Sequence, residues 1–143
     1  MKNVISILIT VCLCAAMTSA WAEQKMTFGE YEVHYIVLPT TFLNAEIADK
    51  YDLPRGRDRA LVNISVLDAD GVPVKAQVTG STKNLLGQRQ QLSFAEVTEG
   101  SAVYYLALLR HADEEFHQLS LDVKLPDGQV GELRFQQKMY WDR

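Results

Sequence analysis

The sequence predicts an all-β fold: an antiparallel, immunoglobulin-like sandwich of two sheets, with about seven strands and one short crossover helix. Beyond residue 22 the dominant hydrophobic period is two, which is typical of strands with one buried and one solvent-facing side. Polar, glycine-containing turns separate these runs. No long amphipathic pattern alternates with the strands, which excludes an α/β fold.

The N-terminal segment, residues 1–22, is predicted to be a cleaved secretory signal peptide. Lys2 supplies a positive charge, residues 4–17 are almost wholly apolar, and Ala20-Trp21-Ala22 places small residues around the cleavage point. The apolar run is shorter than the roughly 20 residues that a membrane-spanning helix needs. We therefore expect a single domain, residues 23–143, to be released into the periplasm without a transmembrane anchor.

Both cysteines, Cys12 and Cys14, lie in the segment that is expected to be removed. Val11 and Leu13 precede them, whereas bacterial lipidation requires a small residue at that position. The mature domain would then have no thiol for a disulfide, a thiolate metal site or a nucleophile, and we expect no cofactor. The formal net charge of −4 argues against a nucleic-acid binder, because no basic excess is available to displace counterions from phosphates.

Six runs of period two predict six strands in order along the chain. Their apolar residues are Tyr31, Val33, Tyr35 and Val37; Ala60, Val62, Ile64 and Val66; Val74, Ala76 and Val78; Leu92 and Phe94; Leu119, Leu121, Val123 and Leu125; and Leu133, Phe135, Met139 and Trp141. The continuous apolar run 102–109 adds a seventh strand. Residues 68–71 and 126–129 are hairpin signals, because their glycines accept the positive φ angle that such turns need. The predicted core residues are Val62, Ile64, Val78, Phe94, Leu121, Val123, Leu133 and Phe135.

The crossover helix is predicted at residues 44–51, between the first two strands. Asn44 can cap its first turn. Leu43, Ile47 and Tyr51 are spaced by four residues and therefore share one face. We expect this helix to cover an open end of the sandwich.

The strand at 102–109 is apolar on both sides, so alternation alone does not orient it. Residues 102–106 have the spacing of an immunoglobulin F strand, which would make Tyr104 an inward-facing tyrosine-corner residue. Val103, Tyr105 and Leu109 would then form an apolar row on the outer face. Such a row is either covered by the helix at 44–51 or is a binding surface or dimer contact.

Arg55, Arg57 and Arg59 form a basic cluster in an acidic chain. Guanidinium groups suit carboxylates and phosphates, so one interpretation is a site for an anion or an acidic partner. The other is a surface loop that pairs with neighbouring aspartates.

His111 and His117 lie in one short segment with three carboxylates. Two imidazoles and a carboxylate can bind a divalent metal, which makes these histidines weak candidates. A charged, solvated loop tip is the alternative interpretation. The spacing fixes no ligand geometry, so no metal site is assigned.

Three stretches of the chain resemble one known family. FLNAEIADKYDLPRGRDRALVNISVLD (42–68), NLLGQ (84–88) and AEVTEGSAVYYLALL (95–109) are similar to a family of secreted gammaproteobacterial proteins called domain of unknown function 4426. The similarity extends from about Phe28 to Trp141. The resemblance implies a periplasmic β-sandwich and implies no activity, cofactor or catalytic residue.

Three classes of function remain open at this point. The leading expectation is a non-catalytic periplasmic domain that interacts with an envelope protein or with a second copy of itself. The second is a module that binds a small molecule, an anion or a metal. A hydrolase ranks last, because the sequence has no nucleophile elbow and no recognisable acid–base pair.

Overall fold

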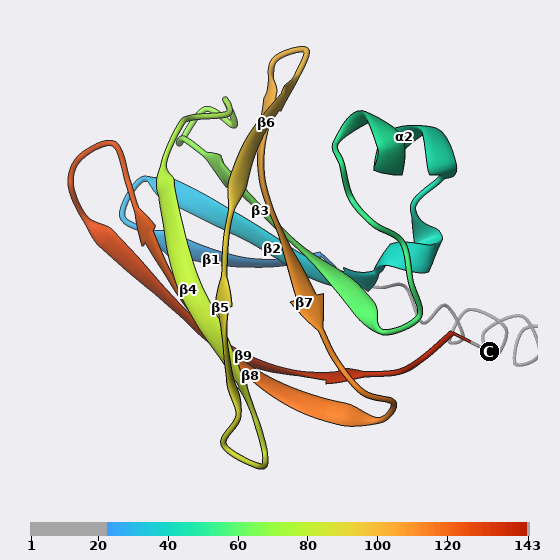
Figure 1. Cartoon of the computed structure of the whole chain (residues 1–143). Coiled ribbons are helices and arrows are strands. Elements are labelled where there is room, and N and C mark those ends of the chain that lie inside the picture. The colour runs from blue at the N-terminus through green and yellow to red at the C-terminus, as the bar shows by residue number, and fades with distance from the viewer. Residues whose placement is uncertain (1–22, 143) are drawn as a thin grey trace, which may run out of the picture.

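The structure is a computed structural model that describes residues 23–142. The predicted signal peptide and both cysteines lie outside these residues. Two antiparallel sheets pack face to face (Figure 1). The five-stranded sheet has the order β1 (Gln24–Phe28), β2 (Tyr31–Pro39), β3 (Arg59–Leu67), β7 (Ala102–Arg110) and β6 (Ala95–Glu99). The four-stranded sheet has the order β5 (Arg89–Leu92), β4 (Gln77–Asn84), β8 (Glu115–Lys124) and β9 (Val130–Met139).

The strand order confirms the predicted immunoglobulin-like sandwich. Strands β2, β3, β7 and β6 stand in the order A-B-E-D, and β5, β4, β8 and β9 stand in the order C′-C-F-G. β1 is an additional edge strand that forms a hairpin with β2. Strand β7 therefore occupies the E position of the fold, and the F position belongs to β8.

The described residues contain nine strands, where about seven were predicted. β1 was missed because its residues are almost all exposed and show no apolar alternation. The predicted strand around Leu92 and Phe94 is two strands, because the chain leaves one sheet after Leu92 and enters the other at Ala95. The predicted strand at 74–79 begins later, at Gln77.

The core lies between the two sheets and confirms most of the predicted inward faces. Val62, Ile64, Leu121, Val123 and Leu133 are fully buried. Val78, Phe94 and Phe135 are partly buried and pack at the margin of the core. The Phe135 ring contacts the Tyr35 ring of the opposite sheet, with 4.6 Å between the centroids.

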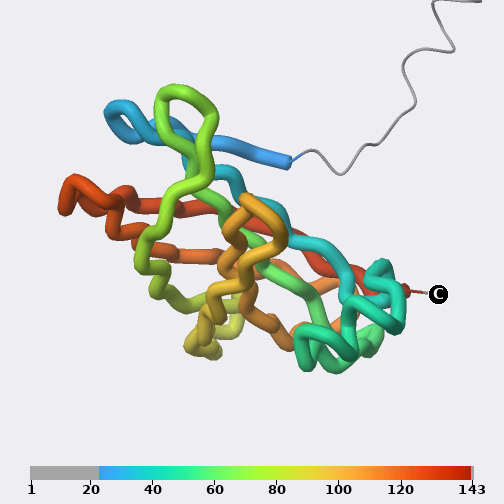
Figure 2. The backbone as a smooth tube through the Cα atoms, turned by 90° about the horizontal axis from the view of Figure 1, so that it is seen from above, coloured from blue at the N-terminus to red at the C-terminus, as the bar shows by residue number. Residues whose placement is uncertain are grey.

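The two sheets are joined at both edges. At one edge the end of the first strand lies near the start of the last strand (Figure 2), and the Phe28 ring of β1 lies so close to Gly131 of β9 that a Cβ atom there would come within 2.7 Å of it. At the other edge, the Gln90 side chain accepts a hydrogen bond from the Arg110 backbone N–H at 2.9 Å and donates one to the Arg110 carbonyl at 3.1 Å. β6 pairs with β7 only from Ala102 to Leu106, so Arg110 lies beyond the paired stretch.

A short helical crossover follows β2, as predicted. It consists of a 3₁₀ turn η2 (Thr40–Phe42) and the helix α2 (Ala45–Lys50). The Asn44 side chain caps α2 by accepting a hydrogen bond from the Ile47 N–H at 2.8 Å. The predicted position of this helix was wrong, because α2 lies beside the outer face of the five-stranded sheet rather than over an open end.

The predicted orientation of β7 was also wrong. Val103, Tyr105 and Leu109 are buried, and the alternate row on the outer face contains Tyr104 and Leu106. The physical reason is register, since Tyr105 lies opposite the core residue Ile64 and a shift of one residue reverses both faces of a strand. The F-strand spacing was assigned to the strand that takes the E position. Val103, Tyr105 and Leu109 are therefore not an exposed binding row.

Tyr105, rather than Tyr104, is the tyrosine whose hydroxyl ties down another segment. The Tyr105 hydroxyl accepts a hydrogen bond from the Ala76 N–H at 2.8 Å and donates one to Glu96 at 2.9 Å. Burial is the main reason that the pKa of Tyr105 is raised above its ordinary value, and the neighbouring Glu96 raises it further. The hydroxyl thereby joins β6, β7 and the segment that leads into β4.

We expect Tyr105→Phe to lower the free energy of unfolding by about 1–2 kcal/mol, because it leaves the Ala76 N–H without its acceptor. Urea unfolding followed by circular dichroism measures this change. Tyr104→Phe is the matched control, since the Tyr104 hydroxyl has no hydrogen bond within residues 23–142 and its loss should cost less than about 0.5 kcal/mol. Equal effects of the two variants would contradict the assignment.

Candidate functional site

A cleft of about 300 Å³ separates α2 from the outer face of β3, β7 and β6. Leu43, Ile47 and Tyr51, which the sequence placed on one helical face, line one wall. The opposite wall is the outward row of the sheet, including Tyr104 and Leu106. The outer face of a two-layer sandwich is ordinarily polar, so an apolar outer face that is only partly covered marks a candidate binding site.

Asn63 is a polar residue in the sheet wall of this cleft. It lies on β3, between Ile36 of β2 and Leu106 of β7. Its Oδ1 atom is buried and has no hydrogen-bond partner among the described residues. Buried polar atoms in folded proteins are nearly always hydrogen-bonded, so an unpartnered acceptor on a residue that lines a cleft is an unusual feature.

The rim of the cleft is held by polar contacts between α2 and the end of β6. The Lys50 ammonium lies 3.2 Å from both carboxylate oxygens of Glu99. The Tyr51 hydroxyl donates a hydrogen bond to the same carboxylate. The Lys50 nitrogen also lies 5.2 Å from the centre of the Tyr51 ring, within range of a cation–π contact. These contacts link the C-terminal end of α2 to the end of β6.

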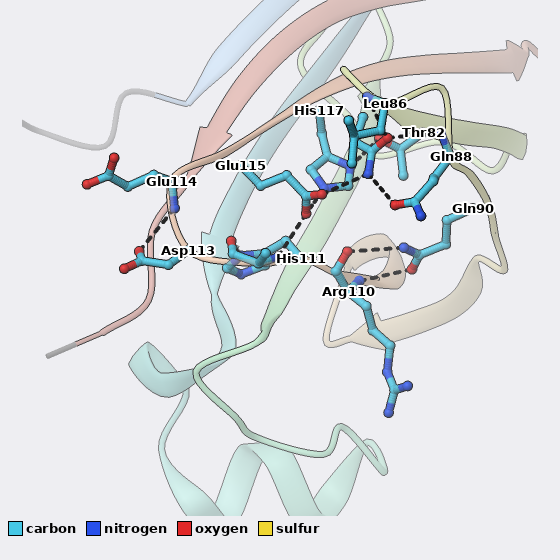
Figure 3. A network of polar contacts seen from close by, with 12 residues as sticks. Thr82, Leu86, Gln88, Gln90, Arg110, His111, Asp113, Glu114, Glu115 and His117 are labelled. Atoms are coloured by element: carbon cyan, nitrogen blue, oxygen red, sulfur yellow. Dashed lines mark hydrogen bonds and ion pairs between the residues drawn. The ribbon is translucent and has the colours of Figure 1, made fainter.

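A second, polar cleft of about 280 Å³ contains the two predicted histidines. His117 is buried, with Nδ1 2.9 Å from the Thr82 hydroxyl and Nε2 2.9 Å from Glu115 (Figure 3). His111 Nδ1 lies 2.8 Å from the Ala112 carbonyl. Within residues 23–142, no three His, Cys, Asp or Glu side chains form a group that could hold a metal ion.

Glu115 is the centre of the polar network in Figure 3. Its carboxylate accepts hydrogen bonds from the Ala112 N–H and the Asn84 amide, each at 2.8 Å, besides the contact with His117. Partial burial acts to raise the pKa of Glu115, but the bonds from Ala112, His117 and Asn84 outweigh it, and the pKa lies below its ordinary value. The network therefore holds an ionised carboxylate that ties β8 to the β4–β5 turn.

The three arginines of the predicted basic cluster have separate partners. Arg55 donates a hydrogen bond to the Thr41 carbonyl at 3.2 Å. The Arg57 guanidinium lies 4.4 Å from the centre of the Trp141 ring, and Arg59 lies 3.6 Å from Asp58. This arrangement favours the interpretation of a surface loop with internal contacts over that of an anion site.

Residues 25–142 match the family described as domain of unknown function 4426. The chain belongs to this family. A crystal structure of a DUF4426 family protein from Pseudomonas aeruginosa is similar in fold, with 30% sequence identity, a TM-score of 0.77, and coverage of 85% of this chain and 97% of that one. A comparison with curated proteins finds no match.

More distant structural neighbours of this DUF4426 chain include FetP from uropathogenic Escherichia coli. A copper-bound FetP variant has 15% identity and a TM-score of 0.52, covering 82% of this chain and 92% of that one. FetP as isolated has 15% identity and a TM-score of 0.50, covering 84% and 92%. At this identity the likeness concerns the fold alone. Neither helix within residues 23–142 has the length and apolar character needed to cross a membrane.

The sequence did not identify the α2 cleft. It indicated one wall, through the shared face of Leu43, Ile47 and Tyr51, but placed that wall over the wrong part of the sandwich. One signal for the cleft was available in the sequence. Asn63 is a polar residue on the outer side of β3, although the next outward residue of that strand, Leu61, is apolar and buried.

Proposed function

We propose that this protein is a non-catalytic binding domain of the periplasm, and that it binds an apolar small molecule carrying a hydroxyl or amide group in the α2 cleft. The observation that carries the proposal is the unpartnered Oδ1 of Asn63 in an otherwise largely apolar wall. Small-molecule sites typically combine apolar walls with a few polar groups that orient the ligand.

The size and position of the cleft support this proposal. A volume of about 300 Å³ is at the lower end of the range for small-molecule sites, which suits a small ligand of up to three aromatic rings or a short alkyl chain. α2 is held by the Lys50, Tyr51 and Glu99 contacts, so the site needs no large rearrangement to bind. A donor on the ligand that reaches Asn63 would satisfy the buried acceptor.

A non-catalytic role is supported by the contacts of the groups whose pKa values are shifted. The pKa of Glu115 is lowered by hydrogen bonds within the fold, and Tyr105 ties strands together. Glu32, whose pKa is lowered chiefly by its hydrogen bond with Lys25, lies at the solvent surface. None of these groups lines the α2 cleft, where a general acid or base would have to act.

The experiment is a fluorescence titration with N-phenyl-1-naphthylamine, an apolar probe with one N–H donor. We expect saturable binding by the wild-type protein and loss of that binding in Leu106→Trp, which fills the cleft. Val72→Trp, on an exposed turn away from the cleft, is the control and should bind like the wild type. Unchanged binding by a folded Leu106→Trp protein would refute the proposed site.

Asn63→Val tests the contribution of the polar contact to binding separately from that of the apolar walls. We expect the affinity for the probe to fall roughly three- to tenfold, which corresponds to one net hydrogen bond. The free energy of unfolding should stay the same or rise by up to about 1 kcal/mol, because a buried unpartnered acceptor is removed. A marked loss of stability would show that Asn63 has a structural role instead.

A copper-binding function is the second candidate. It is favoured by the fold shared with copper-bound FetP and by the presence of His111 and His117 in one cleft. It ranks second because both ring nitrogens of His117 already contact Thr82 and Glu115. Calorimetric titration of the protein with Cu²⁺, compared with His111→Ala, distinguishes the two candidates.

A further inference from the structure

The turn between β4 and β5 presents two leucines to solvent. Leu85 is 71% exposed and Leu86 is 83% exposed, the two highest values among the large apolar side chains of the described residues. Single exposed apolar residues are ordinary, but two adjacent leucines at the end of a hairpin form a projecting apolar tip. We call residues 85 and 86 the leucine tip.

The leucine tip is held rigidly, although its side chains contact little of the protein. The Asn84 side-chain oxygen accepts hydrogen bonds from the Leu86 and Gln88 N–H groups, at 3.1 and 2.9 Å. The Asn84 amide nitrogen donates to Gln88 and to Glu115, each at 2.8 Å (Figure 3). A rigid apolar projection loses little conformational entropy when it enters another apolar phase.

Two basic residues lie on the strands that lead into and out of the leucine tip. Lys83 of β4 and Arg89 of β5 are cross-strand partners, and both are exposed. Neither forms a salt bridge within residues 23–142. Like charges placed opposite each other on adjacent strands are unfavourable unless an anion lies near them. Glu115 does not meet this need, because its oxygens are engaged by Ala112, Asn84 and His117.

We propose that the leucine tip inserts into an anionic lipid surface, with Lys83 and Arg89 placed at the level of the phosphate groups. Two leucines followed by a pair of cations match the order of layers in a bilayer, an apolar interior beneath an anionic headgroup region. The acidic charge of the whole chain does not prevent this, because charges more than about 8 Å away are largely screened at physiological ionic strength.

The test is co-sedimentation of the purified protein with vesicles of phosphatidylcholine alone or mixed with phosphatidylglycerol. We expect binding to the mixed vesicles to be stronger and to weaken with salt. Each basic side chain near such a surface contributes about 1 kcal/mol, or roughly fivefold, so Lys83→Gln with Arg89→Gln should reduce binding roughly 25-fold. Leu85→Ser with Leu86→Ser should reduce it at least about tenfold. Val72→Ser, an exposed apolar residue on another turn, is the matched control and should bind like the wild type.

A second measurement keeps the proposal testable if the double serine variant is poorly folded. Leu86→Trp should show a blue-shifted fluorescence, quenched by brominated lipid, only with the mixed vesicles, and Val72→Trp should not. Absence of binding by the wild-type protein would overturn the proposal, as would equal binding by the serine variant. A wild-type dimer that Leu85→Ser with Leu86→Ser dissociates, without vesicle binding, would also overturn it and assign the tip to contact with a second copy.

Discussion

Leu121→Ala should lower the free energy of unfolding by about 2–5 kcal/mol, the range for a buried leucine whose loss leaves a cavity. Leu121 is fully buried on β8. Its side chain packs against Gly80 of β4 so closely that a Cβ atom at Gly80 would lie 2.5 Å from the Leu121 Cδ2 atom. Because the neighbour is backbone, the surroundings cannot easily collapse into the space, which favours the upper part of the range.

Leu86→Ala is the matched control for this prediction, since it makes the same chemical change at a side chain that is 83% exposed. It should change stability by no more than about 0.5 kcal/mol. Urea unfolding of both variants, monitored by far-ultraviolet circular dichroism, gives the comparison. A Leu121→Ala loss below about 1 kcal/mol would mean that the core is not packed as described.

Glu115→Ala should have the second largest effect, a loss of about 2 kcal/mol or more at neutral pH. The substitution removes the acceptor for the Ala112 N–H and the Asn84 amide and the partner of His117 Nε2. His117 is buried, so its ring nitrogen would be left without a partner in the protein interior. The Glu115 side chain is 21% exposed, and water reaching the site reduces the cost below that of full burial.

The same carboxylate should make stability depend on pH. A group whose pKa is lower in the folded state contributes stability above its unfolded pKa and loses it as pH falls through the folded value. Glu115 should therefore stabilise the protein above about pH 4.5, its ordinary value, and progressively less below it. Glu115→Gln should flatten the acid limb of the stability curve more than Glu32→Gln, whose side chain lies at the surface. An identical acid limb in wild type and Glu115→Gln would refute this role.

The parts of the fold that the sequence predicted are those where one strand face is apolar and the other polar. The faces of β3, β8 and β9 follow directly from alternation, and the core residues Val62, Ile64 and Leu133 confirm them. On β7 both rows are apolar, so orientation depends on which strands become neighbours. That information is contained in long-range pairing, such as Ile64 with Tyr105, and no local pattern encodes it.

The candidate site was predictable only in part, for a related reason. The apolar face of α2 was visible as a spacing of four, but the surface that it covers is assembled from β3, β6 and β7, which are distant in sequence. Asn63 is recognisable as a polar residue in an apolar surface only when the outward-facing row of β7 beside it is known to be apolar. Likewise, the role of Glu115 depends on hydrogen-bond donors from the β4–β5 turn and from Ala112. No periodic pattern in the sequence predicts that these groups lie together.

The contact between Gln90 and Arg110 has a consequence for how copies of this protein behave at high concentration. Past the end of β6, β7 presents a backbone N–H and carbonyl that could act as a template for a strand of another chain. A glutamine side chain carries one amide, with the same donor and acceptor as a peptide group, and here it occupies both positions. At Arg110 the open stretch of β7 is thus satisfied by the protein's own side chain, which should hinder a strand of another chain from pairing there.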